Sequence, residues 1–247
     1  MLGRDHDAIA AFERSLALNP DIGTFARQSV LRQMAAAYAQ LGQDDQARRT
    51  LAEANRLFPF DTVRGHWPED PTSEVYAGQI RRYQEGLRRA GLRDHADEDA
   101  DFGVPADGEL HQVLPGMTPM TAPGARTIRT GELVVLLAEH KPLIIDLMAY
   151  SWGVSIPGAI GLREAGAGGS FSGGGQDRLQ RKITALTGGD LSKPIVAVGW
   201  NSERFDGRNF ALRLVAMGYT NVYWYRGGRE AWEVNGLPET RLTPTDW

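Results

Sequence analysis

Cysteine is absent from the 247 residues of this chain. Without a thiol, the chain can form no disulfide and no thiolate metal site, and it offers neither a cysteine nucleophile nor a sulfur atom that could carry a persulfide. Histidine is also scarce: five residues lie scattered along the sequence, and no two have the spacing of a zinc-binding HExxH motif. We therefore expect no metal ion and no cofactor.

An excess of positive charge is missing as well. Lys and Arg number 27 against 31 Asp and Glu, which gives a formal net charge of -4. This balance offers no electrostatic basis for binding nucleic acid or an anionic membrane. No apolar run approaches the roughly 18 residues of a membrane-spanning helix, and the first residues, MLGRDHDAIAAF, lack the basic and apolar regions of a signal peptide. The sequence predicts a cytoplasmic protein without nucleic-acid or membrane partners.

Two segments in the first third of the chain align without gaps at an offset of 39 residues, from position 3 to position 42. Their matched positions are Gly3 and Gly42, Ala8 and Ala47, Phe12 and Leu51, and Pro20 and Pro59. Glycine would separate two helices, alanine would let them approach, the larger side chain would fill the groove between them, and proline would end the second helix. Residues 1–59 therefore resemble tetratricopeptide repeats, whose usual period is about 34 residues.

The first of these repeats begins at its inter-helix turn, so its leading helix is missing. Because a solenoid unit cannot bury its face alone, we interpret the chain as a fragment or a misassigned start of a longer repeat protein, with a short protein capped by a half-repeat as the alternative. A further helix is expected from Asp70 as N-cap, through Pro71, to a stop at Gly91. Its apolar stripe consists of Tyr76, Ile80, Tyr83 and Leu87. The helical region is thus predicted over residues 1–92.

Residues 93–125 have the composition of a linker. Positions 94–101 read DHADEDAD, and prolines and glycines follow up to position 124. Such a segment cannot form a core of its own, so we expect a flexible acidic and proline-rich tether.

Helical and strand patterns alternate from position 127 onward. Helices are predicted over 130–138 with Thr130 as cap, 176–186, 209–217 and 228–234, and strands over 142–146, 194–198 and 221–225. This alternation indicates a parallel sheet flanked by helices, so the predicted fold class is α followed by α/β. The glycine-rich stretch 166–175 lacks the spacing of a phosphate-binding loop, and we expect it to be a mobile connection.

Several strings in this half resemble the rhodanese superfamily. They are LIID at 143–146, SIPGA at 155–159 in place of the usual HIPGA, the strand PIVAV, MGYTNVY, and RGGREAW at 226–232. The resemblance covers residues 126–239, leaves 240–247 as a tail, and is closest to the branch named for a CxxCW motif. It implies a rhodanese-like α/β domain.

The loop after the central strand departs from that family. In active rhodaneses a cysteine follows the strand, and the backbone N–H groups of the loop surround its persulfide. The resemblance places Trp200 at the nucleophile position, Arg204 at the second cysteine of CxxCW and Phe205 at its tryptophan. Sulfur transfer and cysteine-phosphatase chemistry are therefore excluded, and no catalytic residue is assigned.

The same loop leaves three interpretations open. A loop that feeds a helix N-terminus favours anions, and Arg204 and Arg208 could add charge-assisted contacts. Ser202, the only hydroxyl in the loop, could act as a nucleophile only with a base, for which Glu203 and Asp206 are candidates. The loop could instead be structural or contact a partner, with Trp200 filling the emptied pocket and Asp206 and Gly207 forming the helix cap and entry turn. The candidate site comprises Trp200, Asn201, Ser202, Glu203, Arg204, Phe205, Asp206, Gly207 and Arg208.

These patterns favour a non-catalytic protein that binds a protein or peptide through its helical repeats, with a small anion as a candidate ligand of the loop. One alternative is an enzyme of altered chemistry, such as a hydrolase that uses the 200–208 loop. Another is the C-terminal regulatory part of a signalling enzyme, because YQEGLRRAGL at 83–92 resembles the helix that closes repeat arrays in some bacterial adenylate and guanylate cyclases.

Overall fold

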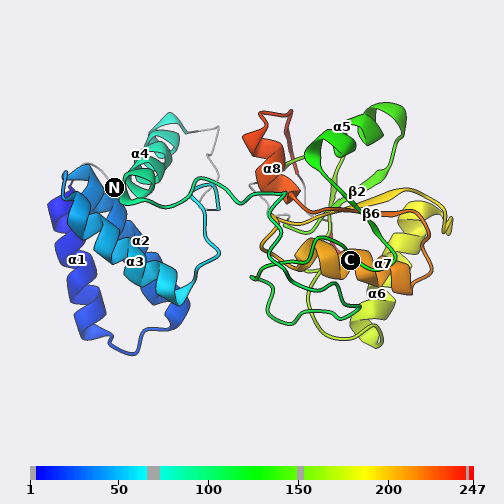
Figure 1. Cartoon of the computed structure of the whole chain (residues 1–247), viewed down its shortest axis with the longest axis horizontal. Coiled ribbons are helices and arrows are strands. Elements are labelled where there is room, and N and C mark those ends of the chain that lie inside the picture. Colours follow the sequence, from blue (N-terminus) through cyan, green and yellow to red (C-terminus); the bar gives the residue numbers. More distant parts are fainter. Residues whose placement is uncertain (1–3, 66–72, 149–152, 243–244) are drawn as a thin grey trace. The chain divides into compact units, whose positions relative to one another are not determined.

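The computed structural model describes residues 4–65, 73–148, 153–242 and 245–247. The chain divides into two compact units, with the boundary between His95 and Ala96. The predicted fold class is confirmed, because the first unit is helical and the second contains a parallel sheet with helices on both faces (Figure 1). Within the described residues, no helix combines the length and apolarity needed to cross a membrane.

The first unit consists of α1 (Asp5–Leu18), α2 (Thr24–Gln40), α3 (Asp44–Leu57) and α4 (Glu74–Ala90). Its core contains many small side chains at the helix contacts, and Ala35, Ala39, Ala47 and Ala54 are completely buried. Small residues allow helix axes to approach closely, as the repeat pattern predicted. The predicted stripe of α4 is confirmed at Ile80, Tyr83 and Leu87, which are buried, whereas Tyr76 is half-buried.

The ends of α4 are formed by a serine and a glycine. Ser73 is the N-cap, and its hydroxyl accepts a hydrogen bond from the Tyr76 amide at 3.3 Å. Gly91 ends the helix in the left-handed conformation with φ 97°, as predicted. The predicted cap at Asp70 and the proline after it lie outside the described residues.

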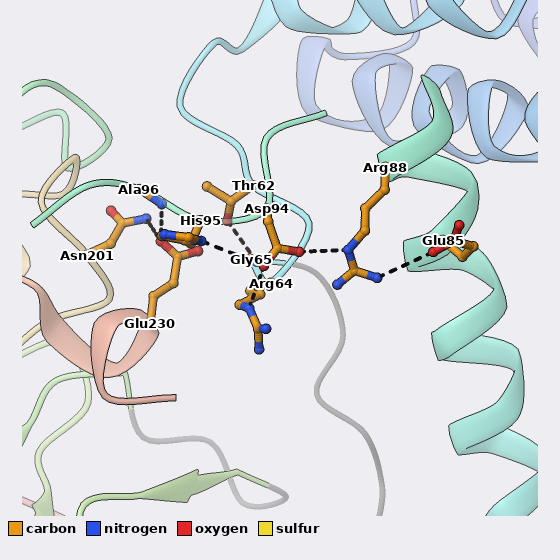
Figure 2. Close-up of polar contacts among 10 residues, drawn as sticks. All are labelled: Thr62, Arg64, Gly65, Glu85, Arg88, Asp94, His95, Ala96, Asn201 and Glu230. Carbon is orange, nitrogen blue, oxygen red and sulfur yellow. Dashed lines mark hydrogen bonds and ion pairs between the residues drawn. The ribbon is translucent and has the colours of Figure 1, made fainter. Parts of the chain in front are cut away.

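Two ion-paired carboxylates connect segments of the first unit. Arg82 of α4 donates two hydrogen bonds to Asp5 of α1, at 2.9 and 2.6 Å. Asp94, just after α4, accepts hydrogen bonds from Arg88 at 2.7 Å and from Arg64 at 2.9 Å (Figure 2). The first contact joins the first and last helices of this unit.

The second unit is built on a five-stranded parallel sheet with the order β1-β6-β5-β2-β4. Its strands are β1 (Arg126–Ile128), β2 (Leu143–Asp146), β4 (Ile160–Gly161), β5 (Ile195–Val198) and β6 (Val222–Tyr225). A second, antiparallel pair joins β3 (Val154–Ser155) to β7 (Thr240–Arg241). The predicted tail is therefore partly a strand of this unit.

Four helices cover the two faces of the sheet (Figure 1). They are α5 (Thr130–Glu139), α6 (Gly174–Thr187), α7 (Asp206–Ala216) and α8 (Gly228–Val234). Alternate residues of β5 lie on opposite faces of the sheet. Ile195 and Ala197 pack with α6 and α7, whereas Val196 and Val198 pack with α5 and α8. All four residues are buried, because a central strand of a parallel sheet is covered on both sides.

Two helix starts differ from the prediction. Helix α7 begins at Asp206 instead of residue 209, so the last three residues of the predicted loop are helical. Thr130 is the first residue of α5 and not its N-cap. The carboxylate of Glu98 instead accepts hydrogen bonds from the Thr130 amide at 3.1 Å and its hydroxyl at 2.9 Å. A carboxylate at a helix N-terminus is favourable because it faces unpaired amides and the positive end of the helix dipole.

The segment expected to be a flexible tether is part of the second unit from residue 96 onward. We call residues 96–125 the strap. It has almost no regular structure, but it is held to the sheet domain by side-chain and backbone hydrogen bonds along its length. The prediction failed because those partners lie about 100 residues away in sequence, where local composition carries no information about them.

The glycine-rich stretch is likewise anchored where a mobile connection was expected. Arg213 of α7 donates hydrogen bonds to the carbonyls of Ala167, Gly168 and Ser170 at 2.7–2.9 Å. It also donates to the Gln176 side chain at 2.6 Å. One buried guanidinium therefore supplies the donors that this stretch of carbonyl oxygens requires.

Candidate functional site

The candidate loop runs from the carboxyl end of β5 into α7, as the sequence predicted. In an open parallel sheet this edge is where ligands usually bind. Most of the loop is nevertheless closed to solvent. Asn201, Ser202 and Glu203 are at most 4% exposed, and Trp200 is half-buried.

Ser202 has no exposed hydroxyl. The side chain is 0% exposed, and Oγ donates a hydrogen bond to the carbonyl oxygen of Asp97 in the strap at 2.7 Å. Its own carbonyl accepts a hydrogen bond from the Thr118 hydroxyl at 2.6 Å. A nucleophilic serine must give its proton to a base, whereas a carbonyl oxygen accepts a hydrogen bond without removing the proton.

Asn201 and Glu230 form a buried polar pair at the start of the loop. Asn201 donates from Nδ2 to the Glu230 carboxylate at 3.0 Å, and the same carboxylate oxygen accepts from the Ala96 amide at 2.8 Å (Figure 2). The Asn201 side-chain oxygen accepts from the Glu203 amide at 3.0 Å. The asparagine therefore organises the loop internally and links it to α8.

The strap pairs with the backbone of the loop. Gly116 donates its amide to the Glu203 carbonyl at 2.8 Å, and the Phe205 amide donates to the Leu114 carbonyl at 2.8 Å. An isolated antiparallel bridge between Pro115 and Arg204 lies between these contacts. The amides of residues 203 and 205 consequently have intramolecular acceptors and are not available to surround an anion.

Both arginines proposed as anion ligands have carboxylate partners in the chain. Arg204 makes two hydrogen bonds to Asp206, at 2.8 and 3.1 Å. Arg208 is 0% exposed and donates to the Asp107 carboxylate at 2.8 Å, to the Asp107 carbonyl, and to the Glu109 carbonyl at 3.2 Å. Burial opposes ionisation of Asp107, but the Glu109 amide and Arg208 outweigh it and lower the pKa of this carboxyl.

The remaining loop positions are packing positions. The Phe205 ring stacks on the His111 ring of the strap with centroids 3.8 Å apart. Gly207 lies in the first turn of α7 against Trp224, where an added Cβ would approach the indole nitrogen to 2.9 Å. A glycine is therefore required for this close approach of helix to strand.

Arg226 is a residue that the sequence analysis placed in a family string without assigning it a role. Its guanidinium is 2% exposed and donates to the carbonyls of Glu98 at 2.7 Å, Ala100 at 2.8 Å, Thr118 at 3.1 Å and Pro119 at 3.1 Å. A buried guanidinium needs several acceptors, and the strap supplies them. An arginine beside two glycines at a strand end was the only signal of this role in the sequence.

Arg229, Asp146 and Ser155 form a second buried cluster at the same edge. The Arg229 guanidinium lies 5.6 Å from the Trp200 ring centroid and 3.6 Å from the Asp146 carboxylate. Ser155, at the position of the family histidine, donates to Asp146 at 2.5 Å. Burial raises the pKa of Asp146 despite Arg229 and the hydrogen bonds that Ser155 and the Met148 amide donate to it. Across the described part of the chain, no three histidine or acidic side chains gather in a way that could hold a metal ion.

Comparison with known proteins supports the domain assignment. The family model of the rhodanese-like domain matches residues 130–235, which confirms this domain in the chain. The strap precedes the matched residues. No curated protein matches the sequence.

Solved structures that are similar to parts of this chain include sulfurtransferases. A full-length protein from Lactobacillus plantarum is 22% identical, with 47% of this chain and 88% of that chain covered and a TM-score of 0.37. A polysulfide-sulfur transferase from Wolinella succinogenes is 16% identical, with 47% and 79% covered and a TM-score of 0.35. A thiosulfate sulfurtransferase from Pseudomonas aeruginosa is 20% identical, with 72% and 33% covered and a TM-score of 0.37.

The chain thus contains a rhodanese-like domain whose loop lacks the atom that carries sulfur. A persulfide requires a cysteine sulfur, and the sequence contains none. The Arg204 and Arg208 side chains are engaged by Asp206 and Asp107, and the amides of residues 203 and 205 by Asn201 and Leu114.

Proposed function

We propose that the chain is a non-catalytic rhodanese-like protein that acts in protein–protein interaction or regulation. The observation that supports this proposal is that the 200–208 loop has neither a cysteine nor an accessible hydroxyl group. Trp200 stands at the nucleophile position, and Ser202, its only hydroxyl, is fully buried and hydrogen-bonded to the Asp97 carbonyl at 2.7 Å. These contacts argue against both sulfur transfer and a hydrolase that uses Ser202.

We further propose that the first unit is of the tetratricopeptide type and provides the partner-binding surface. Three features support this assignment: Gly42 turns the chain between α2 and α3 with φ 74°, Ala47 is fully buried at the contact, and Leu51 is 3% exposed. These are the positions at which the repeat pattern requires a turn, a close approach and a groove-filling side chain.

Exposed apolar side chains indicate where a partner could bind this unit. Leu18 at the end of α1 and Phe25 at the start of α2 are 79% and 82% exposed. Large apolar groups with this exposure are favourable contacts for a protein partner, because burying them removes apolar area from water.

The test is affinity capture with the full chain as bait, read by mass spectrometry. The baits are the wild type, the double variant Leu18→Ser/Phe25→Ser, and the matched control Val134→Ser/Val135→Ser, which removes two exposed apolar residues of α5 in the second unit. We expect a specific protein to be retained by the wild type and the control and lost, by at least about tenfold, from the Leu18/Phe25 variant.

Equal capture by all three baits would contradict binding through this surface. Turnover of a phosphate or carboxylic ester by the wild type that is lost in Ser202→Ala would contradict the non-catalytic assignment.

A further inference from the structure

The strap is held mainly by polar contacts. Of its residues 96–125, only Ala96, Leu110, Thr118, Pro119 and Ala122 are buried, and of these Leu110 and Ala122 pack into the core of the sheet domain. Large apolar side chains of the strap point outward, since Val113 is 72% and Met117 50% exposed. A segment with few buried apolar contacts belongs to the low-stability end of a native structure, and the strap has few although several of its hydrogen bonds are buried.

Arginines donate many of these hydrogen bonds. Arg226 binds carbonyls near both ends of the 98–119 stretch, and Arg208 binds Asp107 and the Glu109 carbonyl between them. Arg129 adds an ion pair with Asp99 at 2.5 Å. The strap is acidic, and two of these arginines, Arg208 and Arg129, bind its carboxylates, whereas Arg226 binds its carbonyls.

The loop contributes a backbone edge to the same face. Residues 203 and 205 exchange hydrogen bonds with Gly116 and Leu114 in an antiparallel arrangement. Main-chain pairing of this kind accepts an extended peptide, and arginines beside it select for acidic side chains.

From these contacts we infer that the strap is a releasable intramolecular cover, and that the face beneath it, formed by the 200–208 loop with Arg208 and Arg226, binds an extended acidic peptide of a partner. The strap and the partner segment have the same chemistry and compete for the same guanidinium groups and loop amides. The covalent attachment of the strap gives it a high effective concentration, so the face is closed until the strap is weakened or outcompeted. The inference deepens the proposed interaction role of the chain.

Opening is tested by native-state amide hydrogen exchange on the full chain. The reporters are the amides of His111 and Gly116 in the strap and Phe205 in the loop, and the reference is the set of buried amides of β5. We expect the three reporters to exchange at least about 100-fold faster than the β5 amides, because the strap opens while the sheet stays folded. Equal protection of reporters and β5 would overturn the inference, because the strap would then open only with global unfolding.

A matched pair of variants tests the role of Arg208 as an anchor. Asp107→Asn removes the carboxylate that Arg208 binds. Glu109→Gln changes a neighbouring residue to which Arg208 donates at the backbone carbonyl, so that contact is kept. Exchange of Gly116 and Phe205 should rise about fivefold or more in Asp107→Asn and stay unchanged in Glu109→Gln. The same effect in both variants would contradict a specific anchor at Asp107.

Partner chemistry is tested with a synthetic peptide of residues 96–117, which includes the residues that pair with the loop, added to Asp107→Asn, with binding followed at the Phe205 amide by NMR. The control peptide has its Asp and Glu residues replaced by Asn and Gln. Saturable binding of the acidic peptide alone supports the inference. Equal binding of both peptides would contradict acidic recognition, and binding of neither would contradict a peptide site at this face. The peptide experiment does not depend on Leu18 or Phe25. A negative result here would therefore contradict the peptide site under the strap without contradicting partner binding through the first unit.

Discussion

At the scale of single residues, two buried arginines account for much of the order in a segment without regular secondary structure. Arg226 makes five hydrogen bonds to the strap, four of them to backbone carbonyls. Burial lowers the pKa of Arg226, and the surrounding carboxylates of Asp101, Asp97 and Asp99 oppose this. The guanidinium remains charged, since an arginine titrates far above neutral pH.

Replacing Arg226 with methionine should lower the free energy of unfolding by about 2–4 kcal/mol, because several buried carbonyls lose their donor. The measurement is urea denaturation followed by tryptophan fluorescence, with Arg181→Met, an exposed position on α6, as the control. A loss below about 0.5 kcal/mol in Arg226→Met would contradict the anchoring role.

The candidate residues were only partly predictable at this scale. The position of the loop and the glycine in its helix entry follow from local patterns, because a buried strand, a turn and a helix are encoded by neighbouring residues. The partners of Ser202, Arg208 and Arg226 are strap residues about 100 positions away. Most of the acceptors in those contacts are backbone carbonyls. Because every residue has a backbone carbonyl, the residue type gives no signal that would predict the contact.

At the scale of elements, the helical unit is connected by an ion pair between its first and last helices. Asp5 is 4% exposed and accepts two hydrogen bonds from Arg82. The hydrogen bond with Arg82 lowers the pKa of Asp5 more than burial raises it. The repeat pattern predicted α1 but not this contact, because the two charges lie 77 positions apart in sequence.

The substitution Asp5→Asn should cost about 1–2 kcal/mol of stability at pH 7, because it removes a charge-assisted pair. A carboxyl with a depressed folded-state pKa stabilises the fold above its ordinary value of about 3.9, and the contribution is lost as the pH falls through the folded value. The difference between wild type and variant in urea denaturation should therefore shrink between pH 7 and pH 2.

Asp7→Asn is the matched control, since Asp7 lies in the same helical turn but pairs with Arg4 at the surface, where its side chain is 64% exposed. A stability difference for Asp5→Asn that is the same at pH 7 and pH 2 would contradict the assigned ionisation.

At the scale of the whole molecule, the main error of the sequence analysis was the domain boundary. The resemblance to rhodaneses begins at residue 126, and the family model matches from residue 130, but the compact unit begins at Ala96. The composition correctly predicted that the strap has no core of its own. It could not predict that the strap forms its hydrogen bonds with donors and acceptors of the sheet domain.

Two fragments, one that begins at residue 96 and one that begins at residue 126, test which of these two positions is the true start of the domain. The 96–247 fragment should unfold cooperatively, and the 126–247 fragment should fold but melt more than about 5 °C lower, since it lacks the strap contacts of Arg208 and Arg226. Differential scanning calorimetry makes the comparison. Equal melting temperatures would mean that the strap adds nothing to the second unit.

We propose that the 200–208 loop is a structural and binding element and not a reaction site that merely lost its cysteine. The most direct measurement is sulfur transfer from thiosulfate to cyanide by the full-length wild type and by Trp200→Cys, together with intact-mass detection of a persulfide. Because the chain has no other cysteine, any persulfide reports on position 200 alone. We predict no turnover and no persulfide in either protein, since the amides of residues 203 and 205 are held by Asn201 and the strap. Persulfide formation and turnover in Trp200→Cys would contradict the account, because the loop would then retain its catalytic geometry.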